Sequence, residues 1–167
     1  MKSRKITIGV IGGAETTVEN YKLAYDVGRL IAGNGAVLLC GGLSGIMEAA
    51  SKGAFENNGY VVGFLPGEEK SNANPYVHIA VPTGMGIARN VLVVRASDAL
   101  IAFPGSYGTL SEIAMALNLG KTVVAMPGTW DLKKIAPVDS ALFKEAFDPG
   151  QAVGLALNAL QIKTAER

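Results

Sequence analysis

The sequence predicts an α/β fold: a doubly wound, mostly parallel sheet in a Rossmann-like three-layer αβα arrangement. Strand-like apolar runs alternate with helical stretches along the chain, which favours parallel strands joined by helical crossovers. Hydrophobic residues make up 49% of the chain and charged residues only 17%, as is typical of a sheet that helices cover on both faces. The length of 167 residues suits one core, so we expect a single domain over residues 1–167.

The first half of the chain supplies three predicted strands and two helices. An apolar run that ends at Gly12-Gly13 predicts the first strand, and Thr16-Thr17-Val18-Glu19 has the form of a capping box at a helix start. Asn34-Gly35 is typical of the end of that helix. The predicted elements are a strand over 6–11, a helix over 18–32, a strand over 36–40, a helix over 46–56, a strand over 60–65 and a surface loop over 66–76.

The second half continues the same alternation. Its predicted elements are a short strand over 77–81, a helix around 86–96, a strand over 99–103, a helix that ends at 119 and a strand over 122–126. Asp148-Pro149-Gly150-Gln151 predicts the start of a final helix, with Asp148 as the N-cap and Pro149 in the first turn. Residues 129–147 predict no definite element.

Four loops follow the carboxyl ends of predicted strands and are expected at one edge of the sheet. Ligands of such folds bind beyond this edge. The four loops are residues 12–17, 41–45, 82–89 and 104–109. Glycines in three of them let the backbone approach a ligand and point several N–H groups at one anion, next to a helix N-terminus. The predicted phosphate- or nucleotide-binding residues are Gly12, Gly13, Gly41, Gly42, Ser44, Gly45, Gly105, Ser106, Tyr107, Gly108 and Thr109. For any single loop, the alternative that glycine only permits a turn stays open.

Several other classes of protein are disfavoured. The sequence has no G-x-G-x-x-G stretch after the first strand and no G-x-x-x-x-G-K-[ST] stretch, which argues against a dinucleotide fold and a P-loop ATPase. His78 and Cys40 are the only residues of their kinds, so we expect neither a metal site nor an internal disulfide. A formal charge of +1 without a basic stripe predicts no nucleic-acid partner and no membrane surface. We expect a cytoplasmic protein.

Three stretches carry a resemblance to a known family. Residues 104–112, PGSYGTLSE, resemble the P-G-G-x-G-T-x-x-E signature of the Lonely Guy (LOG) family, long labelled lysine decarboxylases. Residues 40–47, CGGLSGIM, resemble the family's G-G-G-x-x-G-[LI]-M element, and residues 85–90, MGIARN, resemble a run that ends in Arg-Lys. The resemblance covers about residues 5–127 and looks closest to the molybdenum cofactor carrier protein-like branch of this Rossmann-like superfamily.

The resemblance implies two functions. As in LOG proteins, the domain would bind a small phosphorylated ligand and hydrolyse the N-ribosidic bond of purine nucleoside 5′-monophosphates, with Arg89 and Glu112 as the catalytic residues and no required cofactor. As in the carrier branch, it would instead hold a nucleotide or a pterin-type molybdenum cofactor without changing it. In both cases the resemblance implies a homo-oligomer, a dimer or a tetramer, with the apolar helix near 110–119 as a candidate interface.

The residues themselves leave alternatives open. Thr109-Leu110-Ser111-Glu112 is also a capping box, in which Glu112 would only bond back to the helix start. Arg89 could equally be a surface arginine. Ser106 replaces a family glycine, which predicts strain if its φ is positive. Asn90 replaces the family lysine, which removes one cation from the site.

Overall fold

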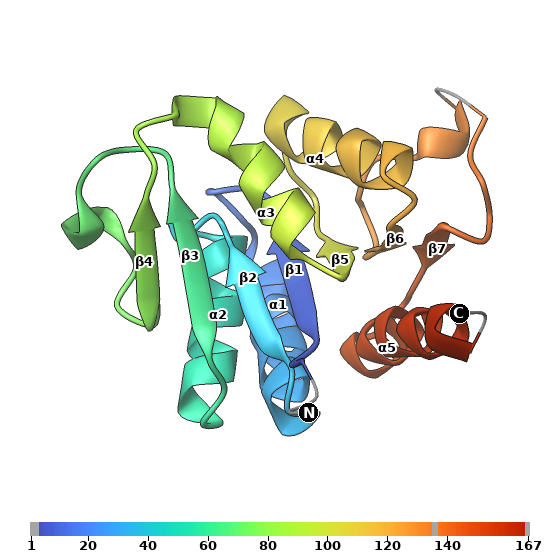
Figure 1. The fold of residues 1–167 in the computed structure, drawn as a ribbon, viewed down its shortest axis with the longest axis horizontal. Coiled ribbons are helices and arrows are strands. Elements are labelled where there is room, and N and C mark those ends of the chain that lie inside the picture. The colour runs from blue at the N-terminus through green and yellow to red at the C-terminus, as the bar shows by residue number, and fades with distance from the viewer. Residues whose placement is uncertain (1–3, 135–136, 166–167) are drawn as a thin grey trace.

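The computed structural model describes residues 4–134 and 137–165 (Figure 1). Its strands are β1 (Thr7–Ile11), β2 (Val37–Cys40), β3 (Val61–Leu65), β4 (Ile79–Pro82), β5 (Ala99–Ala102), β6 (Thr122–Ala125) and β7 (Phe143–Glu145). Its α-helices are α1 (Val18–Gly33), α2 (Ile46–Glu56), α3 (Asn90–Ala96), α4 (Tyr107–Asn118) and α5 (Pro149–Ala165), and its 3-10 turns are η1 (Lys70–Asn72), η2 (Gly86–Arg89) and η3 (Leu132–Lys134). This order confirms the predicted α/β class.

The strands form one seven-stranded sheet in the order β4-β3-β2-β1-β5-β6-β7. Every strand pairing in the described part of the chain is parallel, so the sheet is all parallel rather than mostly parallel. The chain builds outward from β1 to β4, then crosses over and builds the other way from β5 to β7. Strand order therefore reverses between β1 and β5, and this is where open α/β sheets bind ligands.

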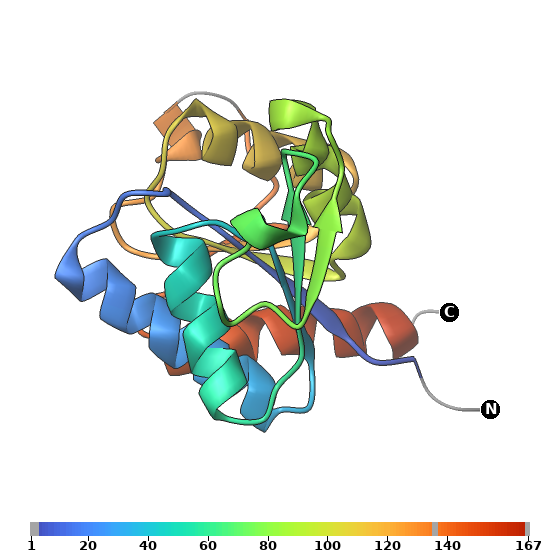
Figure 2. The same ribbon diagram turned by 90° about the vertical axis from the view of Figure 1, so that its left-hand side faces the viewer.

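Helices cover both faces of the sheet, which gives the predicted three layers. Figures 1 and 2 show α3 and α4 on one face and α1, α2 and α5 on the other. A hydrophobic core lies on each face of the sheet, and alternate residues of β5 point into the two cores. Ile101 packs beneath α1, α2 and α5, and Leu100 packs beneath α3 and α4. Both side chains are fully buried, as the two-residue period of a doubly covered strand requires.

Helices α1 and α2 make the closest helix contact, and two glycines permit it. A Cβ on Gly28 of α1 would stand 2.0 Å from the carbonyl oxygen of Ala50 in α2. A Cβ on Gly53 of α2 would stand 1.9 Å from the carbonyl oxygen of Tyr25 in α1. Both contacts are with backbone atoms, which cannot rotate away, so the two backbones can approach this closely only through glycine.

Three local predictions need correction. Thr17, not Thr16, caps α1, because its hydroxyl accepts a hydrogen bond from the Asn20 N–H (3.2 Å), so no capping box forms there. The predicted helix around 86–96 begins as the 3-10 turn η2 and continues as α3. The undecided region contains η3 and the edge strand β7, which is too short to show a periodic pattern.

The predicted start of the last helix is confirmed. The Asp148 carboxylate accepts a hydrogen bond from the Gln151 N–H at 2.8 Å, as an N-cap does. In the described part of the chain, no helix is both long and apolar enough to cross a membrane.

Candidate ligand-binding site

A cavity of about 170 Å³ opens at the carboxyl edge of the sheet, at the reversal between β1 and β5. The ends of β1 and β2, the η2–α3 junction and the start of α4 build its walls. Its lining residues are Val10, Ile11, Gly12, Gly13, Ala14, Gly41, Leu43, Met47, Arg89, Asn90, Ser106, Gly108, Thr109 and Glu112. Three of the four loops that the sequence places at this edge therefore meet in one cavity. The fourth, loop 82–89, reaches it through Arg89 at the end of η2.

Arg89 and Glu112 face each other across this cavity. Arg89 is the last residue of η2 and Glu112 lies in the second turn of α4, and both residues are buried. Arg89 Nη1 lies 3.8 Å from Glu112 Oε1, and Arg89 Nη2 donates a hydrogen bond to the Gly41 carbonyl oxygen at 3.4 Å. Arg89 Nε is buried and has no hydrogen-bond partner. Arg89 is therefore not a surface arginine, because its guanidinium is held inside the protein beside Glu112 and Gly41.

Burial sets the charge state of this pair. Desolvation raises the pKa of Glu112 to about 7, although the nearby Arg89 guanidinium opposes the shift. Desolvation also lowers the pKa of Arg89, against the favourable effect of Glu112. A carboxyl group with a pKa near neutrality can exchange a proton at physiological pH, which suits general acid–base work.

Asn90 completes the pair. The sequence places it in the site only as the residue that replaces the family lysine, and its hydrogen bonds appear only in the structure. It begins α3, is buried, and its Oδ1 accepts a hydrogen bond from Arg89 Nη1. Its Nδ2 donates to the Gly108 carbonyl oxygen at 3.5 Å. The residue that replaces the family lysine therefore links Arg89 to the first turn of α4, while it contributes no charge.

The start of α4 presents unpaired donors to the cavity. Ser106 is the N-cap, but its side chain makes no capping hydrogen bond, and its φ of −88° shows that no strain follows from a side chain at this position. The N–H groups of the first helical turn have no partner within the helix, so Tyr107, Gly108 and Thr109 each direct an N–H out of the helix start, and Gly108 and Thr109 line the cavity. The positive end of the α4 dipole adds to them.

The capping-box alternative for residues 109–112 is wrong. Thr109 lies inside α4 and is buried, because the helix begins at Tyr107. Glu112 therefore sits one turn further along than a capping glutamate and faces Arg89. Local sequence could not exclude the box, since the pattern of residue types is the same whether the helix starts at 107 or 110.

Two glycines of the site are required by close approach. A Cβ on Gly41 would stand 2.3 Å from Arg89 Nη2, so only glycine leaves room for the guanidinium. A Cβ on Gly105 would stand 2.1 Å from Thr109 Oγ1 and 3.0 Å from the Gly13 nitrogen. Gly105 does not line the cavity, but it allows the loops after β1 and β5 to pack together.

Not all of the predicted binding residues reach the cavity. Gly12, Gly13, Gly41, Ser106, Gly108 and Thr109 line it, whereas Gly42, Ser44, Gly45, Gly105 and Tyr107 do not. The Ser44 hydroxyl donates to the Ala14 carbonyl oxygen at 3.0 Å. The Gly42 N–H points to Cys40 Sγ, and the Gly13 N–H donates to the Pro104 carbonyl oxygen at 3.0 Å. These groups hold the loops in place, so their donors are already used within the protein.

Trp130 is a further residue that sequence reasoning missed. Its Nε1 donates to the Gly105 carbonyl oxygen at 3.1 Å, and its ring lies 6.0 Å from the exposed Tyr107 ring. It comes from the region without a predicted element, so no pattern marked it. Through this hydrogen bond it supports the loop before α4.

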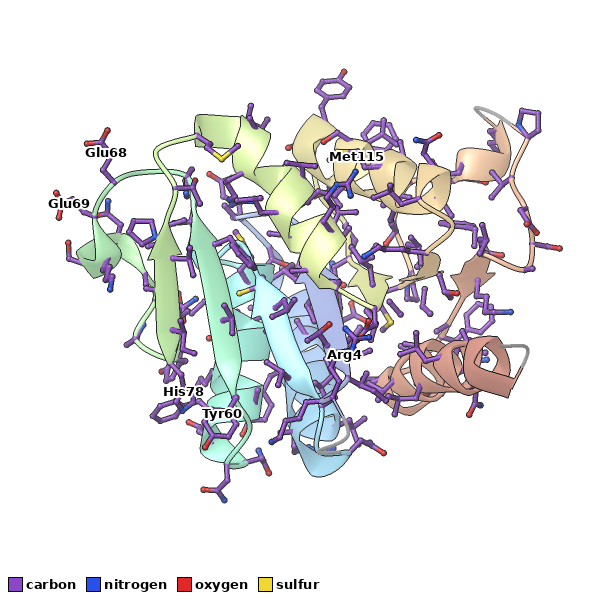
Figure 3. All side chains as sticks on the ribbon, in the orientation of Figure 1. Arg4, Tyr60, Glu68, Glu69, His78 and Met115 are labelled. Carbon is purple, nitrogen blue, oxygen red and sulfur yellow. The ribbon has the colours of Figure 1, made fainter. Side chains whose placement is uncertain are left out.

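His78 lies far from this site. It precedes β4, next to Tyr60 at the opposite end of the sheet (Figure 3), and its Nδ1 accepts from the Val61 N–H. Among residues 4–134 and 137–165, no group of three or more His, Cys, Asp or Glu side chains could hold a metal ion.

Comparison with known proteins identifies the family. Residues 5–153 match the model of the SLOG cluster4 family, which spans most of the fold described above. The chain belongs to the SLOG cluster4 family. This confirms the expected relation to the LOG superfamily.

The relatives of this SLOG cluster4 chain include an uncharacterized archaeal protein and a plant phosphoribohydrolase. An uncharacterized protein from Archaeoglobus fulgidus is 52% identical over 119 residues, which cover 71% of the chain and 78% of that protein. The rice cytokinin riboside 5′-monophosphate phosphoribohydrolase LOG is 30% identical over 107 residues, and the match spans 61% of the chain but only 44% of the rice protein.

A solved structure matches the whole SLOG cluster4 fold. The molybdenum cofactor binding protein from the phototrophic bacterium Rippkaea orientalis has 38% sequence identity and a TM-score of 0.84, and the match covers 98% of this chain and 99% of that one. The carrier-like branch of the superfamily is therefore supported by structure over nearly the full chain.

Proposed function

We propose that this protein binds a small phosphorylated, nucleotide-like ligand in the cavity between β1 and β5. The observation that carries the proposal is that the buried Arg89–Glu112 pair and the open start of α4 line the same cavity. A phosphate group would accept hydrogen bonds from the N–H groups of Gly108 and Thr109, from the Ser106 hydroxyl, and from Arg89.

The size of the cavity indicates how much of the ligand is enclosed. At about 170 Å³ it is smaller than the roughly 300–1,000 Å³ typical of ligand pockets. It would enclose a sugar phosphate, while the rest of a nucleotide would project beyond the mouth. The reacting centre of the sugar would then lie beside Glu112.

The chemistry that this arrangement supports best is hydrolysis of the N-ribosidic bond of purine nucleoside 5′-monophosphates. The bond between C1′ of the ribose and the base nitrogen breaks, and its electrons leave with the base, which takes up a proton. A water oxygen forms the new bond to C1′ and loses a proton, so that nucleotide and water become free base and ribose 5-phosphate. The ionised Glu112 would stabilise the positive charge that develops on the sugar and orient the water. Arg89 would hold the phosphate and favour the ionised form of Glu112.

Turnover of AMP tests this function directly. Purified protein incubated with AMP should release adenine and ribose 5-phosphate, detected by chromatography. Glu112→Gln should lower the rate at least about a hundredfold, the usual order for loss of an acid–base group, while AMP still raises the melting temperature. Glu48→Gln, a half-buried glutamate in the first turn of α2 that does not line the cavity, is the control and should retain full activity. Equal turnover by Glu112→Gln and the unmodified protein would refute the assigned role.

The second candidate is a carrier that holds a pterin-type molybdenum cofactor as cargo without changing it. Two observations favour it: the full-length similarity to the Rippkaea orientalis protein, and the neutral Asn90 where the resemblance implies a cation. In that case protein purified from a host that makes the cofactor would carry a pterin detectable by mass spectrometry, and AMP would protect against heat without being cleaved. Protein that copurifies with no pterin and cleaves AMP would exclude the carrier.

The proposal also includes self-association of the protein. We expect a dimer or tetramer, with α4 as the candidate interface, because Leu110 and Leu117 are only partly buried and Leu119 is exposed. Sedimentation analysis of the unmodified protein would test this, and a monomer at micromolar concentration would contradict it. A cytoplasmic location, no nucleic-acid partner and no required cofactor stay predictions.

A further inference from the structure

Strand β4 forms one edge of the sheet, and in the described part of the chain it pairs only with β3. Figure 2 looks onto this edge and shows η1 on the side of β4 where α2 lies, away from α3. The strand at the other edge, β7, carries Lys144 and Glu145, whereas β4 has no charged residue. Charges on an edge strand oppose pairing with another chain, so β7 has this protection and β4 does not.

Two residues of β4 turn their backbone groups away from β3. The His78 N–H donates to the Val61 carbonyl oxygen, and in a parallel pair only every second residue faces the same neighbour. Ile79 and Val81 therefore direct their N–H and C=O groups toward the open edge. Pro82 falls on an inward position, so its missing N–H removes no donor from this edge.

An apolar surface lies beside this edge, on the face of the sheet that carries α3. Val62 is the register partner of Ile79. Phe64 is the partner of Val81, so both pairs point to the same face, where Phe64 contacts the core beneath α3 and α4. Ile79 is nevertheless 55% exposed and the other three side chains are only half-buried, because α3 runs away from β4 (Figure 1).

We propose that β4 docks against β4 of a second copy of this chain, as an antiparallel pair with its twofold axis at Ala80. In this register Ile79 lies opposite the partner's Val81, and Ala80 lies opposite the partner's Ala80. Each Ile79–Val81 pair exchanges N–H···O=C hydrogen bonds in both directions. The backbone groups that a single copy leaves open are therefore used in the pair.

The same register makes the side chains self-complementary. On the α3 face, the pairing with β3 extends each contact into an apolar row across the axis: Val62, Ile79, the partner's Val81 and the partner's Phe64. Contacts between β-branched and aromatic side chains on neighbouring strands stabilise a sheet. On the opposite face, the central row contains only Gly63 and Ala80 from each copy, which leaves room for the strands to approach.

Charge favours a second copy over an unrelated extended peptide. Glu68 lies beside Gly84, just after the carboxyl end of β4, where a Cβ on Gly84 would be 3.4 Å from Glu68 Cγ. Lys52 Nζ lies 5.8 Å from the centre of the Tyr76 ring, just before the amino end of β4. Antiparallel pairing sets these two ends against each other, so each copy brings an acidic end to a basic one.

Cross-linking through Ala80→Cys tests the pair. Facing residues of a non-hydrogen-bonded antiparallel pair have Cα atoms about 4.5 Å apart, which is within reach of a disulfide. Under mild oxidation at micromolar concentration, this variant should form a disulfide-linked dimer at least about tenfold faster than Lys144→Cys, the matched control at the centre of β7. Cys40 is buried and contributes no cross-link.

Two substitutions separate this surface from α4. In the Ala80→Cys background, Ile79→Lys places a charge in each apolar row and should abolish the cross-link. Leu119→Lys, at the end of α4, should leave the cross-link unchanged. If α4 also associates, two different twofold contacts would close a tetramer.

Hydrogen exchange of the unmodified protein gives an answer that needs no variant to fold. The Ile79 and Val81 amides should exchange at least about tenfold more slowly at high protein concentration than after dilution to the monomer. Equal cross-linking of Ala80→Cys and Lys144→Cys would overturn the proposal, and so would Ile79 and Val81 amides that exchange equally fast at both concentrations. None of these readouts depends on a ligand, so failure of the proposed function is distinguishable.

Discussion

At the scale of single residues, the buried pair of Arg89 and Glu112 governs the site. Burial of two charged groups costs desolvation free energy. The attraction between Arg89 and Glu112 at 3.8 Å and the hydrogen bond from Arg89 to Asn90 offset only part of this cost. Such a pair is poor evidence for stability and good evidence for function, because apolar residues of similar size would serve the fold better.

The raised pKa of Glu112 predicts how stability depends on pH. Its folded pKa of about 7 exceeds the ordinary 4.5, so the folded state holds the proton more tightly than the unfolded state. The contribution of Glu112 to the free energy of unfolding is therefore full below about pH 4.5 and is lost as pH rises through 7. The loss amounts to about 3 kcal/mol at most, from 1.36 kcal/mol per pKa unit.

Urea denaturation of the unmodified protein and of Glu112→Gln across pH 5–8 checks this. The stability of the unmodified protein relative to the variant should fall as pH rises. Two stability curves that stay parallel over this range would show that Glu112 titrates normally.

At the scale of elements, the N-terminus of α4 has competing demands from stability and binding. Ser106 makes no capping hydrogen bond, so the helix start is left open toward the cavity. Ser106→Asp should cap the helix and complement its dipole, raising stability by about 0.5–1 kcal/mol. The same carboxylate would occupy the position of a ligand phosphate, so affinity for ribose 5-phosphate should fall at least about tenfold. Calorimetric melting and binding measurements on one preparation test both effects, and stronger binding by this variant would refute phosphate docking there.

The contact of α1 with α2 predicts a purely structural effect. Gly53→Ala should destabilise the fold by about 1–3 kcal/mol, because its Cβ would overlap the Tyr25 carbonyl oxygen. Gly154→Ala, in α5, is the control: nothing lies within 4 Å of its Cβ, and removal of glycine from a helix stabilises by roughly 0.5–1 kcal/mol. Opposite shifts of the melting temperature are expected, and equal shifts would show that α1 and α2 can separate at little cost.

At the scale of the whole molecule, periodic elements could be predicted and irregular ones could not. The long elements α1 and α2 and the central strands follow apolar patterns, so their positions agree with the sequence to within a residue or two. Strand β7 has only three residues and depends on pairing with β6, which no local pattern records.

The same contrast holds for the site. Its loops could be placed because the carboxyl ends of parallel strands meet at one edge. The sequence could not show which donors of these loops are free to bind a ligand, because the Gly13 N–H and the Ser44 hydroxyl bond to residues distant in the sequence. The buried position of Asn90 and the support from Trp130 depend on tertiary packing in the same way.

The central claim is that an anion docks on the N–H groups at the start of α4, beside Arg89. The most direct test is titration of the ¹⁵N-labelled protein with ribose 5-phosphate, followed by the amide resonances of residues 105–109. Saturable shifts confined to these amides and to the loops around the cavity are expected, and Ser106→Asp should abolish them. Amides of 105–109 that do not move, while others elsewhere respond to the ligand, would contradict it.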